Sequence, residues 1–195
     1  VPVECPLWIL AVATAFAVIF AKEVFGGTGY NIFNVALVTR AFLFFAYPTK
    51  MSGESVWVTT EPVFGIGSAN SLVDGFTGAT ALGQAKGAEG TLEAITNAVG
   101  EPISTMDMII GLIPGSIGET SVIAIALGAI FLLWTGVASW KTILSIFVGG
   151  GVTAYLFNMW GVNPIMQLPW YEHLLLGGFC FGAVFMATDP VTSPR

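Results

Sequence analysis

Apolar residues in this chain come in long runs separated by short polar or glycine-rich segments. Five of these runs cover residues 7–20, 32–47, 120–140, 142–160 and 173–188. A hydrocarbon core takes roughly 20 apolar residues per helix, so the last three runs fit well and the first is short. A weaker apolar piece covers residues 108–113. The pattern predicts an all-α polytopic membrane protein.

Composition strengthens this prediction. Hydrophobic residues make up 55% of the 195 positions, charged residues only 9%, and the mean hydropathy is +0.82. In soluble domains about a quarter of the residues are charged. The charged residues of this chain are too few to cover the surface of a water-soluble globule. The chain starts at Val1 and stops at Arg195, directly after an apolar run. We therefore expect an internal part of a longer subunit.

Charge placement divides the chain into three parts and gives an orientation. Transmembrane helices are expected in residues 1–47 and 108–195, on either side of a polar loop at 48–107. That loop holds seven acidic residues against Lys50 and Lys86, whereas the turn after residue 140 carries only Lys141. Basic residues favour the cytoplasmic side. This weak signal places Lys141 in the cytoplasm and the loop outside a bacterial inner membrane.

The glycine-rich segment Gly26-Gly-Thr-Gly-Tyr-Asn31 interrupts the chain where a helix would continue. Irregular backbone at membrane depth survives only where it lines a cavity or is buried in protein, and broken helices point to binding sites. Asn31 and Asn34 would project from the start of the next helix, beside its free N–H groups. We interpret both asparagines as candidate ligand contacts.

Two charged residues have open interpretations. Arg40 lies inside the second apolar run, where a guanidinium is costly. It either reaches the interface near Tyr47 or contacts an anionic cofactor. Asp189 closes the last run just before Pro190, and it either meets cytoplasmic water or belongs to an ion path.

Other polar residues point to structural roles. Pro114-Gly-Ser-Ile-Gly-Glu119 is interpreted as a turn and helix start, with Ser116 as cap and Glu119 at the capping-box position. His173 stands alone and is interpreted as interfacial, and Cys180 as a small buried hydrophobe. The sequence shows no group of residues with the spacing of metal ligands.

The chain resembles the B subunits of the Na+-translocating NADH:quinone reductases and the related D subunits of Rnf complexes. The resemblance rests on five segments in family order. These segments are Ala21-Lys-Glu-Val-Phe-Gly-Gly-Thr-Gly29, Arg40-Ala-Phe-Leu-Phe-Phe-Ala-Tyr-Pro48, Asp74-Gly-Phe-Thr-Gly-Ala-Thr-Ala-Leu82, Ile113-Pro-Gly-Ser-Ile-Gly-Glu119 and Phe185-Met-Ala-Thr-Asp-Pro190.

The resemblance implies covalent FMN, joined through a phosphoester to Thr80 by a flavin transferase that works outside the cytoplasm. Its recognition pattern is matched by Asp74, Gly75, Thr77, Gly78 and Ala79. The resemblance also implies riboflavin, with Asn31, Asn34 and Arg40 as candidate contacts, and access for ubiquinone. It implies interrupted helices arranged in repeats like those of urea transporters.

The function implied is a membrane subunit of a redox-driven sodium pump that passes electrons from NADH toward ubiquinone. Asp189 and Glu23 are candidates for the ion path. Expected partners are the other subunits of the complex, the flavin transferase, lipid and Na+, without nucleic acid. Because the family's terminal helices are missing, we expect this stretch alone to be inactive.

Two points qualify this resemblance. Val35 stands where the family commonly has proline, which leaves the start of that helix open. A ferredoxin:NAD oxidoreductase subunit of the Rnf type is the related alternative. A urea-transporter-like solute channel and a non-redox scaffold are alternatives of other classes, and neither needs the Thr80 motif.

Overall fold

The computed structural model describes residues 1, 5–51, 80–87, 95–96, 102–116 and 118–193. In this part the chain is mostly helical and contains no strand, only an isolated bridge between Thr96 and Pro102. The helices are α1 (Leu7–Ala21), η1 (Glu23–Phe25), α2 (Val35–Ala46), α3 (Pro48–Met51), α4 (Ala81–Gly87), α5 (Thr105–Ile110), α6 (Val122–Trp134), α7 (Trp140–Trp160), α8 (Pro164–Gln167), α9 (Trp170–Leu175), α10 (Phe179–Phe181) and the π-helix η3 (Gly182–Met186). The all-α prediction is confirmed for these residues.

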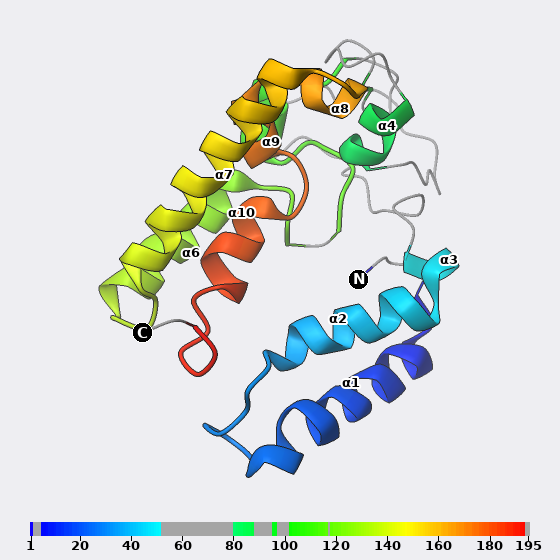
Figure 1. The fold of residues 1–195 in the computed structure, drawn as a ribbon, viewed down its shortest axis with the longest axis vertical. Helices are drawn as coiled ribbons and strands as arrows, with labels where there is room; N and C mark the ends of the chain where they lie inside the picture. The colour runs from blue at the N-terminus through cyan, green and yellow to red at the C-terminus, as the bar shows by residue number, and fades with distance from the viewer. Residues whose placement is uncertain (2–4, 52–79, 88–94, 97–101, 117, 194–195) are drawn as a thin grey trace.

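Helices α1 and α2 form an antiparallel hairpin, which lies apart from the other helices in Figure 1. Ala13 and Ala17 of α1 are fully buried, and Leu43 of α2 is buried with Ala13 in one apolar cluster. Small residues let helix backbones approach closely, as is common between membrane helices. The rings of Phe16 and Phe42 stack across the pair with centroids 4.7 Å apart. The hairpin is therefore held by close apolar packing.

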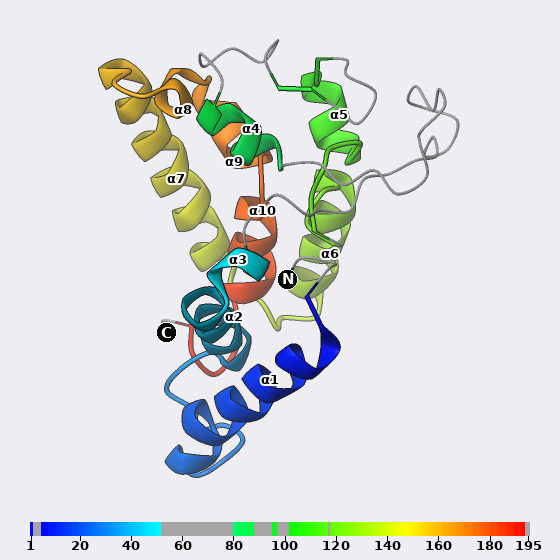
Figure 2. The same ribbon diagram turned by 90° about the vertical axis from the view of Figure 1, so that its right-hand side faces the viewer.

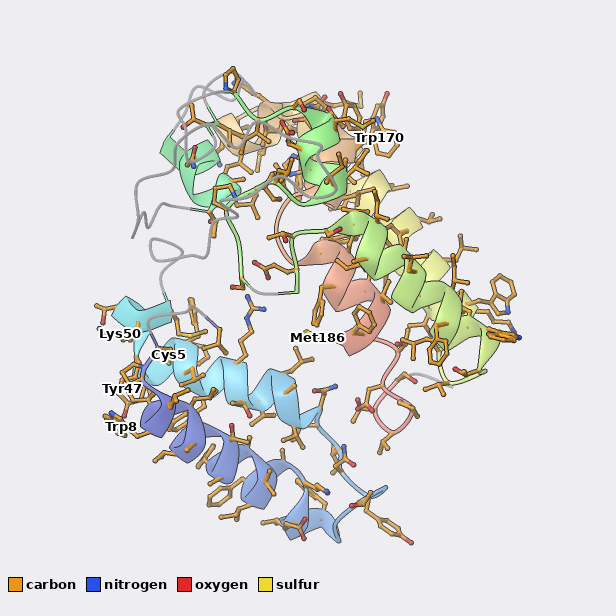
Figure 3. The ribbon with its side chains drawn as sticks, turned by 180° about the vertical axis from the view of Figure 1, so that it is seen from behind. Cys5, Trp8, Tyr47, Lys50, Trp170 and Met186 are labelled. Carbon is orange, nitrogen blue, oxygen red and sulfur yellow. The ribbon has the colours of Figure 1, made fainter. Side chains whose placement is uncertain are left out.

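One end of the hairpin collects side chains typical of a membrane–water interface. Cys5, Trp8, Tyr47 and Lys50 lie together there, where α1 begins and α2 ends (Figure 3). Trp8 is 63% exposed, and amphipathic rings with a neighbouring lysine are typical of this region. We interpret this end as an interfacial edge of the hairpin.

Two of the described helices are long and apolar enough to cross a membrane, namely Leu7–Phe25 and Trp140–Trp160. The 12 residues of α2 reach only about 18 Å at the helical rise per residue. A hydrocarbon core is roughly 30 Å thick. The apolar run expected at 32–47 is therefore helical over too short a length to span by itself.

Helix α7 packs against α8, α9 and η3. The segment α10–η3 lies between α7 and α6 in Figure 2 and contacts both helices. Glycines permit the closest approaches. A Cβ on Gly128 would lie 2.7 Å from Phe185 Cζ, and one on Gly150 only 2.5 Å from Phe179 Cζ. Both aromatic rings therefore fill space that a larger residue would take.

The run expected as one span at 173–188 is interrupted. Helix α9 ends at Leu175, Gly177 takes a positive φ of 64°, and the chain resumes as α10 and the π-helix η3. Figure 3 marks the two ends of this broken segment with Trp170 and Met186. A similar unit precedes it, in which α5 ends at Ile110, with Gly111 as its C-cap, and α6 begins only at Val122.

The sequence predicted the helix start of α6 at the wrong residue. Glu119 Oε1 accepts a hydrogen bond from Ser116 N at 3.0 Å, so the expected turn is present. The helix starts later, at Val122, because Ser121 Oγ accepts from Ala124 N at 3.3 Å and caps it. Ser116 closes a turn inside the interruption.

Gly111→Ala should destabilise the protein. Gly111 has φ +103°, and an added Cβ would lie 2.8 Å from the backbone Cα of Ser121. Strained backbone of this kind costs about 1–3 kcal/mol before the steric clash. Thermal unfolding of the purified protein in detergent should show a lower Tm.

Gly149→Ala is the matched control, because a Cβ there meets nothing within 4 Å. This helical position should be neutral or slightly stabilised, since alanine is favoured over glycine in a helix. Equal Tm values for the two variants would contradict the importance of the Gly111 conformation.

Candidate functional site

Thr80 occupies the position immediately before α4. Its Oγ1 accepts a hydrogen bond from Gly83 N at 3.0 Å, and its carbonyl oxygen accepts from Gln84 N at 2.9 Å. The residue is half-buried. Within the described part of the chain, the hydroxyl proton of Thr80 is donated to no acceptor. An ester on this oxygen would therefore replace a proton that the local structure does not use.

A small cavity of about 10 Å³ separates Thr80 from the two helix interruptions. Its other walls include Gly115 and Glu119 from the segment before α6, and Gly177 from the break after α9. Leu82 of α4 closes against that break, since a Cβ on Gly177 would lie 2.7 Å from Leu82 Cδ1. The start of α4 is thus packed at the junction of both interruptions.

Helix α4 is also tied to the loop that follows it. Gln84 Oε1 accepts from Thr96 N at 2.8 Å, and Gln84 Nε2 donates to Thr96 O at 3.0 Å. These paired bonds fix α4 against a segment twelve residues away. The other predicted motif residues, Asp74, Gly75, Thr77, Gly78 and Ala79, lie outside the described residues.

The structure brings Asn34 and Asp189 together across 155 residues of sequence. Asn34 caps α2, because its Oδ1 accepts from Ala36 N at 2.9 Å and from Leu37 N at 3.2 Å. Its Nδ2 donates to Asp189 Oδ2 at 3.3 Å. That carboxylate oxygen also accepts from Thr192 Oγ1 at 2.6 Å. The glycine-rich break and the end of the last apolar run therefore meet.

Asn34 was expected beside the free N–H groups of the next helix, and this position is confirmed. Because its side chain already satisfies two of those groups, they are not open to a ligand. The helix begins at Val35, its first helical position, where proline is also favoured. Valine at this position, where the resemblance led us to expect proline, is therefore compatible with a helix that starts there.

The other predicted residues are not drawn into this contact. Asn31 Nδ2 donates to the nearby carbonyl of Phe33 at 3.2 Å. Arg40 is exposed on α2, and Glu23 is exposed in η1 beside Gly27. Across the described residues, no hydrogen bond or ion pair joins either charge to Asp189.

A larger cavity of about 730 Å³ lies between α7, α8, α9 and α10. Its lining is mainly apolar, with Phe157 from α7 and Phe179 from α10 among the walls. His173 also lines it, and its Nε2 is buried and meets no hydrogen-bond partner among the described residues. From the sequence, His173 was interpreted as interfacial, because an apolar pattern does not show the cavity that forms where four successive helices pack together.

Glu172, next to His173, was not singled out from the sequence. It is 0% exposed, and neither carboxylate oxygen has a hydrogen-bond partner in the part of the chain that the structure describes. Leu168 and Leu176, each four residues from Glu172 and just outside α9, are both buried in one apolar cluster. That spacing is the signal that could have located it.

These features define a helical membrane protein with interrupted helices that meet at Thr80 and at Asp189. A model of the NQR2, RnfD, RnfE family matches residues 1–195. The chain belongs to this family.

Curated relatives are similar over nearly the whole chain. The B subunit of the Na(+)-translocating NADH-quinone reductase of Chromohalobacter salexigens is 49% identical over 98% of this chain and 43% of its own length. Its counterpart in Klebsiella pneumoniae is 48% identical over 99% of this chain and 44% of its length. The counterpart in Neisseria meningitidis serogroup A is 47% identical, again over 99% of this chain and 44% of its length. The chain spans less than half the length of these relatives.

Asn34→Ala should lower the free energy of unfolding by about 1 kcal/mol, the usual cost of losing an N-cap side chain. Asn34→Ser should recover most of the cap, because serine also caps well, but it is too short to keep the bond to Asp189. Thermal or denaturant unfolding of the purified variants measures both effects.

The same pair made in an Asp189→Ala background separates the two roles of Asn34. In that background, Asn34→Ala should still be less stable than Asn34→Ser, because only serine keeps the cap. Asn34→Ser itself should no longer lower the free energy of unfolding, because the bond to Asp189 is already absent. An Asn34→Ala protein as stable as the unmodified one would show that the cap and its link to Asp189 contribute nothing.

Proposed function

We propose that this chain is a membrane component of a redox-driven sodium pump and carries FMN covalently on Thr80. In this proposal it passes electrons that originate from NADH toward ubiquinone, in a bacterial inner membrane. It acts together with other subunits of an NADH:quinone reductase complex, after a flavin transferase has attached the FMN.

The observation that carries the proposal is the position of the Thr80 hydroxyl. It ends the motif Asp74-Gly-Phe-Thr-Gly-Ala-Thr80 in a family member. Its oxygen supports α4 as an acceptor, while its proton has no role in the described structure. Esterification at this oxygen is therefore compatible with the local fold.

Tethering gives a physical reason for a covalent flavin. A group linked to a protein acts at a high effective concentration, whatever its intrinsic affinity. Bound FMN would supply one- and two-electron redox chemistry, with nearby protein groups setting its electronic properties. Thr80 would hold the cofactor, and the fixed position of α4 would limit where it can lie.

We further propose that the region around α2 contacts a second flavin, riboflavin. Asn31, Asn34 and Arg40 are the candidate contacts, and the exposed guanidinium of Arg40 is free to meet an electron-rich ring or an anion. Access for ubiquinone belongs to the same proposal.

Sodium transfer is proposed to involve Asp189 and Glu23. Asp189 lies at the contact between two interrupted segments, where irregular backbone and polar side chains can receive an ion.

The two units that consist of a short helix followed by a break, α5 with α6 and α9 with α10, are proposed as repeats of the urea-transporter type. Because the family also includes RnfD, a ferredoxin:NAD oxidoreductase subunit is the second candidate function.

Thr80→Ala should abolish covalent flavin. Membranes containing the protein with its flavin transferase would be run on a denaturing gel and viewed under ultraviolet light. The unmodified protein should give a fluorescent band, and the Thr80→Ala protein none, because the attachment oxygen is gone.

Thr120→Ala provides the control, since Thr120 lines the same small cavity as Thr80. Its band should remain. A fluorescent Thr80→Ala band would place the flavin elsewhere, and a dark unmodified protein would favour a channel or scaffold.

Asp189→Ala should raise the Na+ concentration needed for half-maximal quinone reductase activity of the assembled complex. The carboxylate is lost from the proposed path, whereas Asp107→Asn, in the capping box of α5, removes a carboxylate outside it. Steady-state rates over a Na+ series measure the effect. An unchanged Na+ dependence for Asp189→Ala would remove Asp189 from the path.

A further inference from the structure

We propose that the 730 Å³ cavity between α7, α8, α9 and α10 seats the isoalloxazine ring of the flavin carried on Thr80, with His173 as a polar partner of the ring. This inference rests on the proposed attachment at Thr80. To the attachment point it adds the binding site of the isoalloxazine ring and the residues that would surround the ring.

The ring needs a separate site because the space beside Thr80 is too small. The cavity at Thr80 measures about 10 Å³, and a single water already needs about 10–15 Å³. Small-molecule sites are typically about 300–1,000 Å³, a range that includes the larger cavity. Of the two cavities, only the larger can enclose a three-ring system.

The larger cavity lies within the neighbourhood of α4. Helix α4 packs against α8, and Ile165 and Met166 of α8 line the cavity. On its other side, Leu82 of α4 contacts the break at Gly177, which follows the cavity-lining part of α9. Figures 1 and 2 both show α8 between α4 and α7. A tether that starts at Thr80 thus starts at a helix packed against α8, one wall of the cavity, and against the break that follows α9, another wall.

The cavity walls suit a flat aromatic ring. Phe157 and Phe179 contribute aromatic surface from two different helices. Gly150 leaves the room that Phe179 occupies, since a Cβ there would lie 2.5 Å from Phe179 Cζ. Phe147 fixes this ring further in an edge-to-face contact with centroids 5.6 Å apart. Aromatic rings favour offset or edge-to-face contacts with other rings.

His173 Nε2 is buried at the cavity and has no hydrogen-bond partner among the described residues. Asn163 also lines the cavity, with an exposed side chain that makes no cap bond to α8. A buried polar atom left unpaired costs about 1–3 kcal/mol. The polar edge of an isoalloxazine ring alternates carbonyl, N–H and carbonyl groups. It can pair with an imidazole in either tautomer and with an amide.

The α8 wall is held in place before any ligand binds. Asn158 Nδ2, from α7, lies within 3.2 Å of the carbonyl oxygens of Met166 and Gln167 and 2.9 Å from that of Leu168. One amide therefore gathers the end of α8 against α7. Pre-organised walls reduce the ordering cost of binding.

The first test fills the cavity. Ala154→Phe adds a ring at a cavity-lining position of α7, and Val152→Phe adds the same ring on the exposed face of that helix. Both variants of the whole protein should keep the fluorescent band on a denaturing gel. Iodide quenching of the flavin in the native protein should rise roughly three- to tenfold for Ala154→Phe alone, because pocket ligands bury about 70–90% of their surface.

The second test changes the polar partner with little change in volume. His173→Phe should alter the visible absorption band shape and the redox midpoint potential of the covalent flavin, and His173→Gln should restore both toward the original values. Unchanged quenching in Ala154→Phe, or unchanged spectrum and potential in His173→Phe, would overturn the ring site while the band on the gel upholds Thr80. Absence of the band from the unmodified protein would instead overturn the attachment itself.

Discussion

Each interrupted helix leaves backbone N–H and C=O groups without their usual partners, and lipid cannot supply replacements. The structure meets this constraint with side chains at fixed points. Asn34 caps α2, Ser104 and Asp107 form a reciprocal capping box at α5, and Asn158 holds the carbonyls at the end of α8. Because these contacts fix where the chain leaves and re-enters helix, they also fix the spaces between helices.

The sequence predicted the helical class and three of the interruptions, because glycine, proline and an isolated carboxylate mark them plainly. It missed the break at Gly177, since residues 173–188 are apolar throughout and glycine is common in membrane helices. Thr80 was proposed as a site through its motif and not through periodicity. The position of His173 at a cavity could not be predicted, because the cavity depends on how four successive helices pack against each other.

The helix interruptions place different polar groups in two regions of the structure, one around Thr80 and one around Asp189. At the junction of both breaks, α4 presents the Thr80 hydroxyl beside Gly177, close to a cavity able to hold a ring. Farther along the broken segment, Asp189 accepts from Asn34 and joins it to the α1–α2 hairpin. In the proposed function, the first region holds the electron carrier and the second belongs to the ion path. The short chain between them, α10 and η3, includes a π-helix, a form often found at functional sites.

The most direct test of a flavin on Thr80 is a mass measurement on the protein from its own membrane. Cleavage after lysine should release residues 51–86, which contain Thr80. The account predicts that this peptide is heavier by one FMN less one water, and that fragmentation places the added mass on Thr80. An unmodified peptide, or the same mass on Thr77, would contradict it.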